Sequence, residues 1–244
     1  MFGFNAKAQL NIQAIDSIIQ SAANAHFFEG TVLVAENGNI AYQKSFGHKD
    51  KDAKIPIDNS TRYSIASVTK LFTAIITLQL VDEGQFKLTD NLNSLIPELD
   101  IPESTNITVH HLLLHISGLP NENDEIYGIP KSPRAFVVET VSNESNSIGA
   151  FNYANLDYVL LGLIIEKYEN MTYEQVVQKR ILDKYSMHQS GFLSKGNYPE
   201  NFAYSYSYGK DDTRQADPLF FIENYYAAGA MYSTAEDLLK LDQA

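Results

Sequence analysis

The apolar stretch from Ser67 to Glu83 constrains the fold of this chain more than any other segment. Its apolar residues recur with helical spacing and Gly84 follows them, so we predict one long helix with a buried face. Ser67 and Lys70 stand three residues apart at the head of this helix and therefore share one face. A lysine turned inward there is costly unless it has a role. A serine hydroxyl beside a buried amine is one way to make a nucleophile without histidine.

The spacing of this serine and lysine does not decide the question by itself. Ser207 and Lys210 repeat it among tyrosines and a glycine, without any helical pattern, and we discount that copy. Taken alone, Ser67 and Lys70 fit a solvent-facing pair at a helix start as well as they fit a catalytic pair.

A second polar pair, Tyr153 and Asn155, comes directly before a predicted helix at Leu156–Tyr168. Two residues apart on a loop, both side chains can point into one cleft. The simpler interpretation is a tyrosine packed against the core and an asparagine that caps the helix. Tyr168 and Asn170 repeat the spacing, but they fall at the end of the same helix and are predicted to terminate it.

The remaining elements are predicted from periodicity and turn residues. An amphipathic helix is expected at Leu10–Ala25, and two β-rich runs around Asn37-Gly38 predict a hairpin over residues 30–46. The chain up to about Lys184 is mainly helical in pattern, and residues 190–232 are irregular or strand-like. Shorter helices are expected near residues 89–92, 108–115, 134–141, 173–182 and after Thr234.

Composition narrows the class of protein. The 244 residues are enough for a sizeable core, and 44% of them are hydrophobic. A net charge of −12 argues against nucleic acid or anionic membranes as partners. The longest apolar run, about Tyr158–Ile165, is too short for a membrane span. The N-terminus lacks a signal-peptide pattern, so the protein is expected to be cytosolic or to have lost such a signal.

Metal and cofactor chemistry find little support in the sequence. There is no cysteine, which excludes disulfides and thiolate chemistry. His111 and His115 could share a helical face as metal ligands. The residues between them are three leucines, without the glutamate of a zinc hydrolase helix, and no third ligand is evident, so structural roles are expected. No Gly-x-Ser-x-Gly motif or glycine-rich phosphate loop occurs. We therefore predict neither a metal nor a cofactor.

Four segments together resemble one known superfamily. They are similar, in the same order and over nearly all of the chain, to serine β-lactamases and penicillin-binding proteins. The similarity is greatest to the class C-like branch, which includes class C β-lactamases, D-alanyl-D-alanine carboxypeptidases and related serine esterases. The matching segments are Tyr63–Lys70, Leu112–Pro120, Phe151–Gly162 and Ala228–Leu239.

The resemblance implies an α+β fold of the β-lactamase/transpeptidase type. That fold has an antiparallel sheet flanked by helices and an all-helical lobe, with the active site between them. A single domain over residues 1–244 is expected, with an N-terminal helix and hairpin at about 8–48. The helical lobe would occupy about 64–190, and a return segment would occupy 191–244.

The resemblance also assigns roles. Ser67 would be the acylated nucleophile, Lys70 its partner and Tyr153 a proton-transfer group, while Asn155 would hold the substrate amide or the lysine. Free lysine and tyrosine titrate near 10, so burial or a neighbouring charge must adjust them, and either Lys70 or Tyr153 could serve as the base. One oxyanion donor would be the backbone N–H of Ser67 at the helix N-terminus.

One family motif is missing from this sequence. Family members have Lys or His, then Ser or Thr, then Gly, on a strand lining the cleft. The Ser-Gly pairs here, at Ser117 and Ser190, follow Ile116 and Gln189 instead. We expect that the domain is truncated at its C-terminus, that its sheet is incomplete, and that a partner segment would complete it.

The functional expectation is a serine hydrolase that forms an acyl-enzyme on Ser67. Its substrate would be a small molecule or peptide: a β-lactam, a D-Ala-D-Ala-type peptide, or a small ester or amide. The alternative is a non-catalytic ligand-binding or sensor domain of the penicillin-binding type. The resemblance favours an extracytoplasmic location, periplasmic or secreted, and leaves a cytoplasmic one open, while the oligomeric state stays undetermined.

Overall fold

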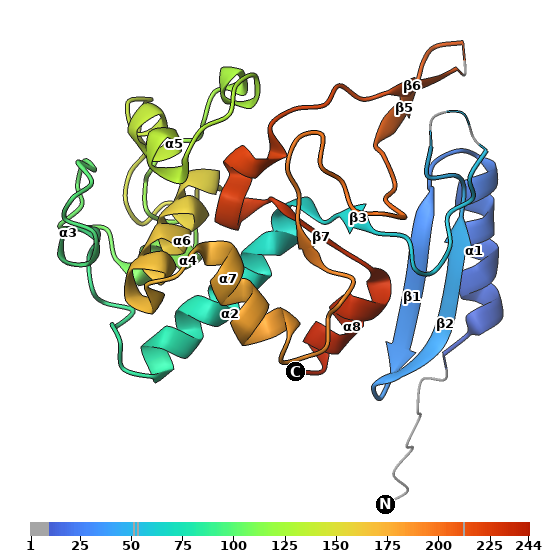
Figure 1. Cartoon of the computed structure of the whole chain (residues 1–244), viewed down its shortest axis with the longest axis horizontal. Coiled ribbons are helices and arrows are strands. Elements are labelled where there is room, and N and C mark those ends of the chain that lie inside the picture. Colours follow the sequence, from blue (N-terminus) through green and yellow to red (C-terminus); the bar gives the residue numbers. More distant parts are fainter. Residues whose placement is uncertain (1–9, 51, 53, 212) are drawn as a thin grey trace, which may run out of the picture.

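The computed structural model describes residues 10–50, 52, 54–211 and 213–244 (Figure 1). Residues 8 and 9, the start of the predicted N-terminal unit, lie outside them. One side of the molecule holds a β-hairpin backed by a helix, and the other side is a lobe of helices. Short strands and the last helix lie between the two (Figure 1). This is the mixed α+β arrangement that the sequence predicts.

The N-terminal unit forms as its turn residues predict. Helix α1 (Ile12–Asn24) is capped by Asn11, whose side chain accepts from the backbone of the first turn. Strands β1 (Gly30–Glu36) and β2 (Asn39–Phe46) pair antiparallel. The turn between them has φ of 51° and 78°, left-handed values that asparagine and glycine adopt most easily.

The other strands are short. Strand β7 (Met231–Ser233) pairs antiparallel with both β3 (Tyr63–Ser64) and β4 (Gly191–Phe192). A separate hairpin joins β5 (Tyr206–Tyr208) and β6 (Arg214–Ala216). Within the described residues, the strands therefore form three small sheets and no closed sheet.

Helices α2 and α6 form the centre of the helical lobe. Phe72 and Ile76 of α2 have no exposed surface, and every residue of α6 from Leu156 to Ile165 is buried. Burying a large apolar side chain is worth about 1.5–3 kcal/mol, so this contact is a main source of stability.

The lobe consists of α2 (Thr69–Asp82), α3 (Leu92–Leu95), α4 (Val109–Leu113), α5 (Pro133–Thr140), α6 (Asn155–Glu169) and α7 (Tyr173–Val177). Shorter turns are η1 (Ala66–Val68), η2 (Asp124–Tyr127), η3 (Gln178–Leu182) and η4 (Ile222–Ala228), and α8 (Ala235–Asp242) follows β7.

Three boundaries differ from the sequence prediction. The regular helix begins at Thr69, and Ser67 lies in the 3-10 turn η1 before it. Helix α3 begins after Asn91, which caps it, rather than near residue 89. Asn155 does not cap α6, because it is already the first helical residue. No helix in the described part of the chain combines the length and apolarity needed to cross a bilayer.

Candidate active site

Ser67 is held at the N-terminal end of α2 by a strained turn. Ala66 has a φ of 43°, a left-handed value that is costly for a residue with a Cβ and is often found at functional sites. The backbone N–H of Ile65 donates to Met231 O at 3.0 Å, which fastens this turn to β7. Ser67 is exposed while Lys70, one turn later, is 7% exposed. The predicted nucleophile is therefore accessible and its partner is buried.

The Lys70 ammonium uses its three N–H donors on three oxygens. Lys70 Nζ lies 3.2 Å from Ser67 Oγ, 2.7 Å from Asn155 Oδ1 and 2.9 Å from Ala228 O. Burial lowers the pKa of Lys70, and interactions with Tyr153, Glu122 and Asp157 partly oppose that shift. A buried lysine with a lowered pKa and a direct contact to a serine is the chemical arrangement that the spacing suggested.

Tyr153 and Asn155 join the pair as predicted. Lys70 Nζ lies 4.8 Å from the centroid of the Tyr153 ring, and Tyr153 is 42% exposed. Asn155 turns its side-chain oxygen to Lys70 and its nitrogen to Glu122, 2.7 Å from Oε1. The structure thus brings all four predicted site residues together, and the side-chain oxygen of Asn155 accepts a hydrogen bond from Lys70. Their catalytic roles stay predictions.

A buried polar cluster lies against Tyr153 that the sequence reasoning did not connect to the site. Asp157 has no exposed surface, and its carboxylate contacts His115 Nδ1 at 2.9 Å and accepts from Ser117 Oγ at 2.5 Å. Burial raises the pKa of Asp157, although the bonds to His115 and Ser117 favour its charged form. The His115 ring centroid is 4.4 Å from that of Tyr153. All three residues lie in segments that resemble the family, and that resemblance is the sequence feature that could have linked them to the site.

The histidines expected to be structural have protein partners. His111 accepts from the backbone N–H of Thr108 and completes a capping box at the start of α4. His115 pairs with Asp157. No group of three or more metal-ligating side chains occurs among the residues that the structure describes.

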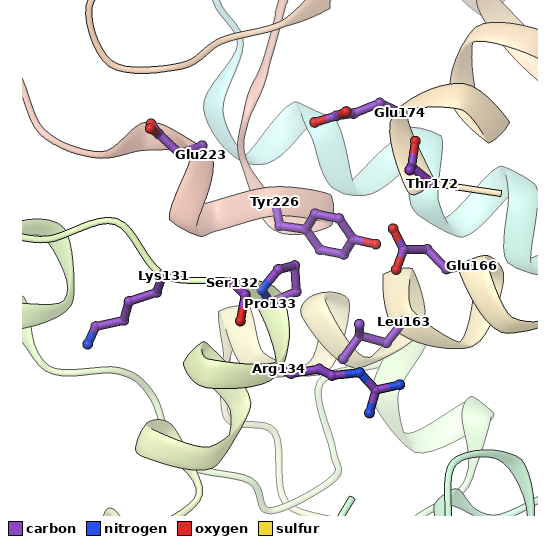
Figure 2. A pocket seen from close by; sticks show the side chains of 10 residues that line it. All are labelled: Lys131, Ser132, Pro133, Arg134, Leu163, Glu166, Thr172, Glu174, Glu223 and Tyr226. Carbon is purple, nitrogen blue, oxygen red and sulfur yellow. The ribbon is translucent and has the colours of Figure 1, made fainter. Parts of the chain in front are cut away.

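A pocket of about 400 Å³ lies near the site but does not include it (Figure 2). Tyr226 points its hydroxyl toward Glu166 there (Figure 2). Tyr226 has a left-handed φ of 43°, and burial is the main cause that raises its pKa. The carbonyl of Ala228, two residues later, accepts from Lys70, so η4 contributes residues both to this pocket and to the surroundings of the lysine. Its lining is Lys131, Ser132, Pro133, Arg134, Leu163, Glu166, Thr172, Glu174, Glu223 and Tyr226.

The chain is similar to known proteins over nearly its whole length. Penicillin-binding protein 4* of Bacillus subtilis is 28% identical over 251 residues, which cover 94% of this chain and 55% of that protein. The solved octameric penicillin-binding protein homologue of Pyrococcus abyssi superposes with a TM-score of 0.83 at 28% identity, over 96% of this chain and 56% of the other. A D-amino acid amidase of Ochrobactrum anthropi, solved with L-phenylalanine amide, gives a TM-score of 0.78 at 26% identity, over 93% and 68%.

A family model and the solved structures establish the family and the fold. The chain spans about half the length of the curated relatives it matches. The family model described as Beta-lactamase matches residues 15–244, which is nearly the whole chain. The fold is accordingly of the β-lactamase/transpeptidase type. By sequence and by structure, this chain belongs to the beta-lactamase family.

Proposed function

We propose that this chain forms the acyl-transfer site of a serine hydrolase, with Ser67 as the residue that becomes acylated. The observation behind the proposal is the buried Lys70, whose Nζ lies 3.2 Å from the exposed Ser67 Oγ and which also contacts Asn155. A nucleophile next to a base that a third group orients is the general arrangement for covalent catalysis by serine.

The chemical steps follow from these contacts. Ser67 Oγ attacks the substrate carbonyl carbon while its proton moves to the Lys70–Tyr153 pair. In this proposal the backbone N–H of Ser67, which lies in η1 just before α2, stabilises the oxyanion. The bond to the leaving group then breaks, and that group takes up the proton. Water finally hydrolyses the ester on Ser67 and regenerates the hydroxyl.

The substrate class is an acyl donor that such a site can open. A β-lactam, a D-Ala-D-Ala-type peptide, or a small ester or amide all meet this requirement. The relatives described above support this range: two are penicillin-binding proteins or homologues, and one is a D-amino acid amidase.

A second candidate is a domain that binds such ligands without turning them over. It is favoured by the name of the Bacillus subtilis relative, which is a penicillin-binding protein. The serines of the two Ser-Gly pairs in this chain have partners of their own: Ser117 donates to Asp157, and Ser190 donates to Asp237 at 2.9 Å. This candidate predicts saturable binding or a stable acyl adduct, with no released product.

Intact-mass spectrometry with benzylpenicillin and a fluorophosphonate tests the proposal. We expect one adduct on Ser67, absent in Ser67→Ala and retained in Ser207→Ala, which removes the serine of the other Ser-x-x-Lys copy. If neither reagent modifies Ser67, the acyl-transfer proposal is wrong. Release of product on extended incubation separates a hydrolase from a binding domain.

A further inference from the structure

Glu122 is a carboxylate at the site that the chemistry above does not use. It lies on the loop that follows α4 and is partly buried. Its Oε1 accepts from Asn155 Nδ2 at 2.7 Å, while Asn155 Oδ1 accepts from Lys70 at 2.7 Å. One amide group therefore connects the Glu122 carboxylate to the Lys70 ammonium.

The loop that carries Glu122 is fastened to the start of α6 by its neighbour. The Asn121 side chain accepts from the backbone N–H of Asn155 at 3.1 Å and donates to Tyr153 O at 2.5 Å. Asn121 and Glu122 thus hold both the backbone and the side chain of Asn155. The Glu122 carboxylate is therefore positioned by three hydrogen bonds, two made by the Asn121 side chain and one by Glu122 itself.

The charges around Lys70 give this arrangement a consequence. The groups that interact with the ammonium include Ser67 on η1, Tyr153 before α6, Tyr158 and Asp157 on α6, and Glu122 on its loop. Two of these are carboxylates. Asp157 is bonded to His115 and Ser117, whereas Glu122 reaches the lysine through Asn155. A negative charge near a buried ammonium favours its protonated form and opposes the effect of burial.

We propose that Glu122 is a positioning residue for proton transfer at Ser67: it orients the Asn155 amide against Lys70, and its charge holds a proton on the Lys70–Tyr153 pair. This inference rests on the acyl-transfer function proposed above. Asn155 presents its oxygen to Lys70 because its nitrogen is bonded to Glu122. The Lys70–Tyr153 pair must lose a proton before it can accept the proton of Ser67. The negative charge of Glu122 makes that loss less favourable.

The sign of the effect is the same whichever group is the base. Acylation requires the Lys70–Tyr153 pair to have lost one proton. A nearby anion stabilises the state that still holds it, so Glu122 raises the pH at which acylation sets in. Neutralising Glu122 should move the acid limb of the acylation profile to lower pH.

Second-order rate constants for fluorophosphonate labelling of Ser67, measured from pH 5 to 9, test this prediction. Glu122→Gln keeps a hydrogen-bond acceptor and removes the charge, whereas Glu122→Ala removes both. Glu125, an exposed glutamate three residues later in η2, supplies the matched control Glu125→Gln. We expect the acid limb to move down in both Glu122 variants and to stay in place for Glu125→Gln. The plateau rate should fall further in Glu122→Ala, several-fold, because Asn155 then loses its acceptor.

The possible outcomes separate the two proposals. If wild-type Ser67 is labelled but the acid limb of Glu122→Gln coincides with that of the wild type, the inference about Glu122 is wrong and the hydrolase proposal stands. A plateau loss in Glu122→Ala without a shift of the acid limb in either Glu122 variant would leave the charge of Glu122 without an effect on Lys70, which also overturns the inference. If wild-type Ser67 is not labelled at any pH, both proposals fail. Circular dichroism melts of all variants show that any change occurs in a folded protein.

Discussion

The chain contains the same Ser-x-x-Lys spacing twice, and the two copies have opposite surroundings. Lys70 is 7% exposed and bonds Ser67, Asn155 and Ala228. Lys210 is exposed, beside the short hairpin of β5 and β6. Identical local spacing therefore produces a buried, oriented amine in one place and a solvated one in the other.

Long-range contacts make the difference between the copies. Two of the three acceptors of Lys70 come from residues 85 and 158 positions further along the chain. The segment that supplies Ala228 also receives a hydrogen bond from Thr73, through Ala227 O at 2.6 Å. The helix brings the serine and lysine near each other, and the packing of α6 and η4 against α2 gives the lysine its environment.

Replacing the two lysines should have the most unequal effects. Lys70→Ala removes a group in contact with Ser67 and is expected to slow fluorophosphonate labelling by about 10²–10⁴-fold, the usual contribution of a positioned acid or base. Lys210→Ala should leave the labelling rate within about twofold of the wild type. Equal rates for the two variants, measured by stopped labelling and intact mass, would remove the basis for distinguishing the copies.

Tyrosine replacements extend the comparison. Tyr153→Phe removes the hydroxyl beside Lys70 and is expected to slow labelling by about 10²-fold. Tyr208 follows Ser207 in the sequence, and its hydroxyl donates to Glu29 at 2.7 Å; Tyr208→Phe removes that hydroxyl. It should cost about 1 kcal/mol of unfolding free energy and leave the labelling rate unchanged. Chemical denaturation and labelling kinetics on both variants check these outcomes. A labelling defect in Tyr208→Phe would indicate that the hairpin contributes to the site.

The parts of this structure that local patterns specify could be predicted from the sequence. The β1–β2 hairpin follows from Asn37-Gly38, and the buried helices α2 and α6 follow from their apolar residues. Ser67 and Lys70 are neighbours because helical geometry alone brings them together. Tyr153 and Asn155 needed the family resemblance, since nothing local distinguishes them from a packed ring and a helix cap.

The rest depends on contacts between distant segments. The bond from Asn155 to Glu122 joins residues 33 positions apart, and that from His115 to Asp157 joins residues 42 apart. No periodicity encodes either pairing. The left-handed φ values of Ala66 and Tyr226 are equally invisible to local patterns, because neither residue type favours that conformation. These features require the packed fold.

Two aspartates offer a smaller contrast, in stability. Asp157→Asn keeps the shape of a fully buried side chain but replaces one of the two oxygens that contact His115 and Ser117 with an amide nitrogen. We expect a loss of about 1–3 kcal/mol in unfolding free energy, because one of these buried contacts loses its carboxylate oxygen. Asp211→Asn, at the exposed turn of the β5–β6 hairpin, should change it by less than about 0.5 kcal/mol. Urea denaturation of both variants checks the difference, and equal losses would contradict it.

The smallest expected effect is a difference in pH dependence between the two lysines. Burial lowers the pKa of Lys70 in the folded state, so the unfolded chain binds more protons than the folded one between that pKa and the ordinary lysine value of 10.5. Stability contributed by this group therefore rises with pH in that window, by at most about 1.4 kcal/mol per pH unit.

Comparing Lys70→Met with the wild type isolates this contribution. The unfolding free energy of the wild type minus that of Lys70→Met should increase from neutral pH toward pH 10, since only the wild type retains the lysine. The corresponding difference for Lys210→Met should stay flat, because Lys210 is exposed to solvent. Urea denaturation at successive pH values gives both curves. A flat difference for Lys70→Met would mean that Lys70 is as well solvated as Lys210, and the contrast between the two copies would then rest on geometry alone.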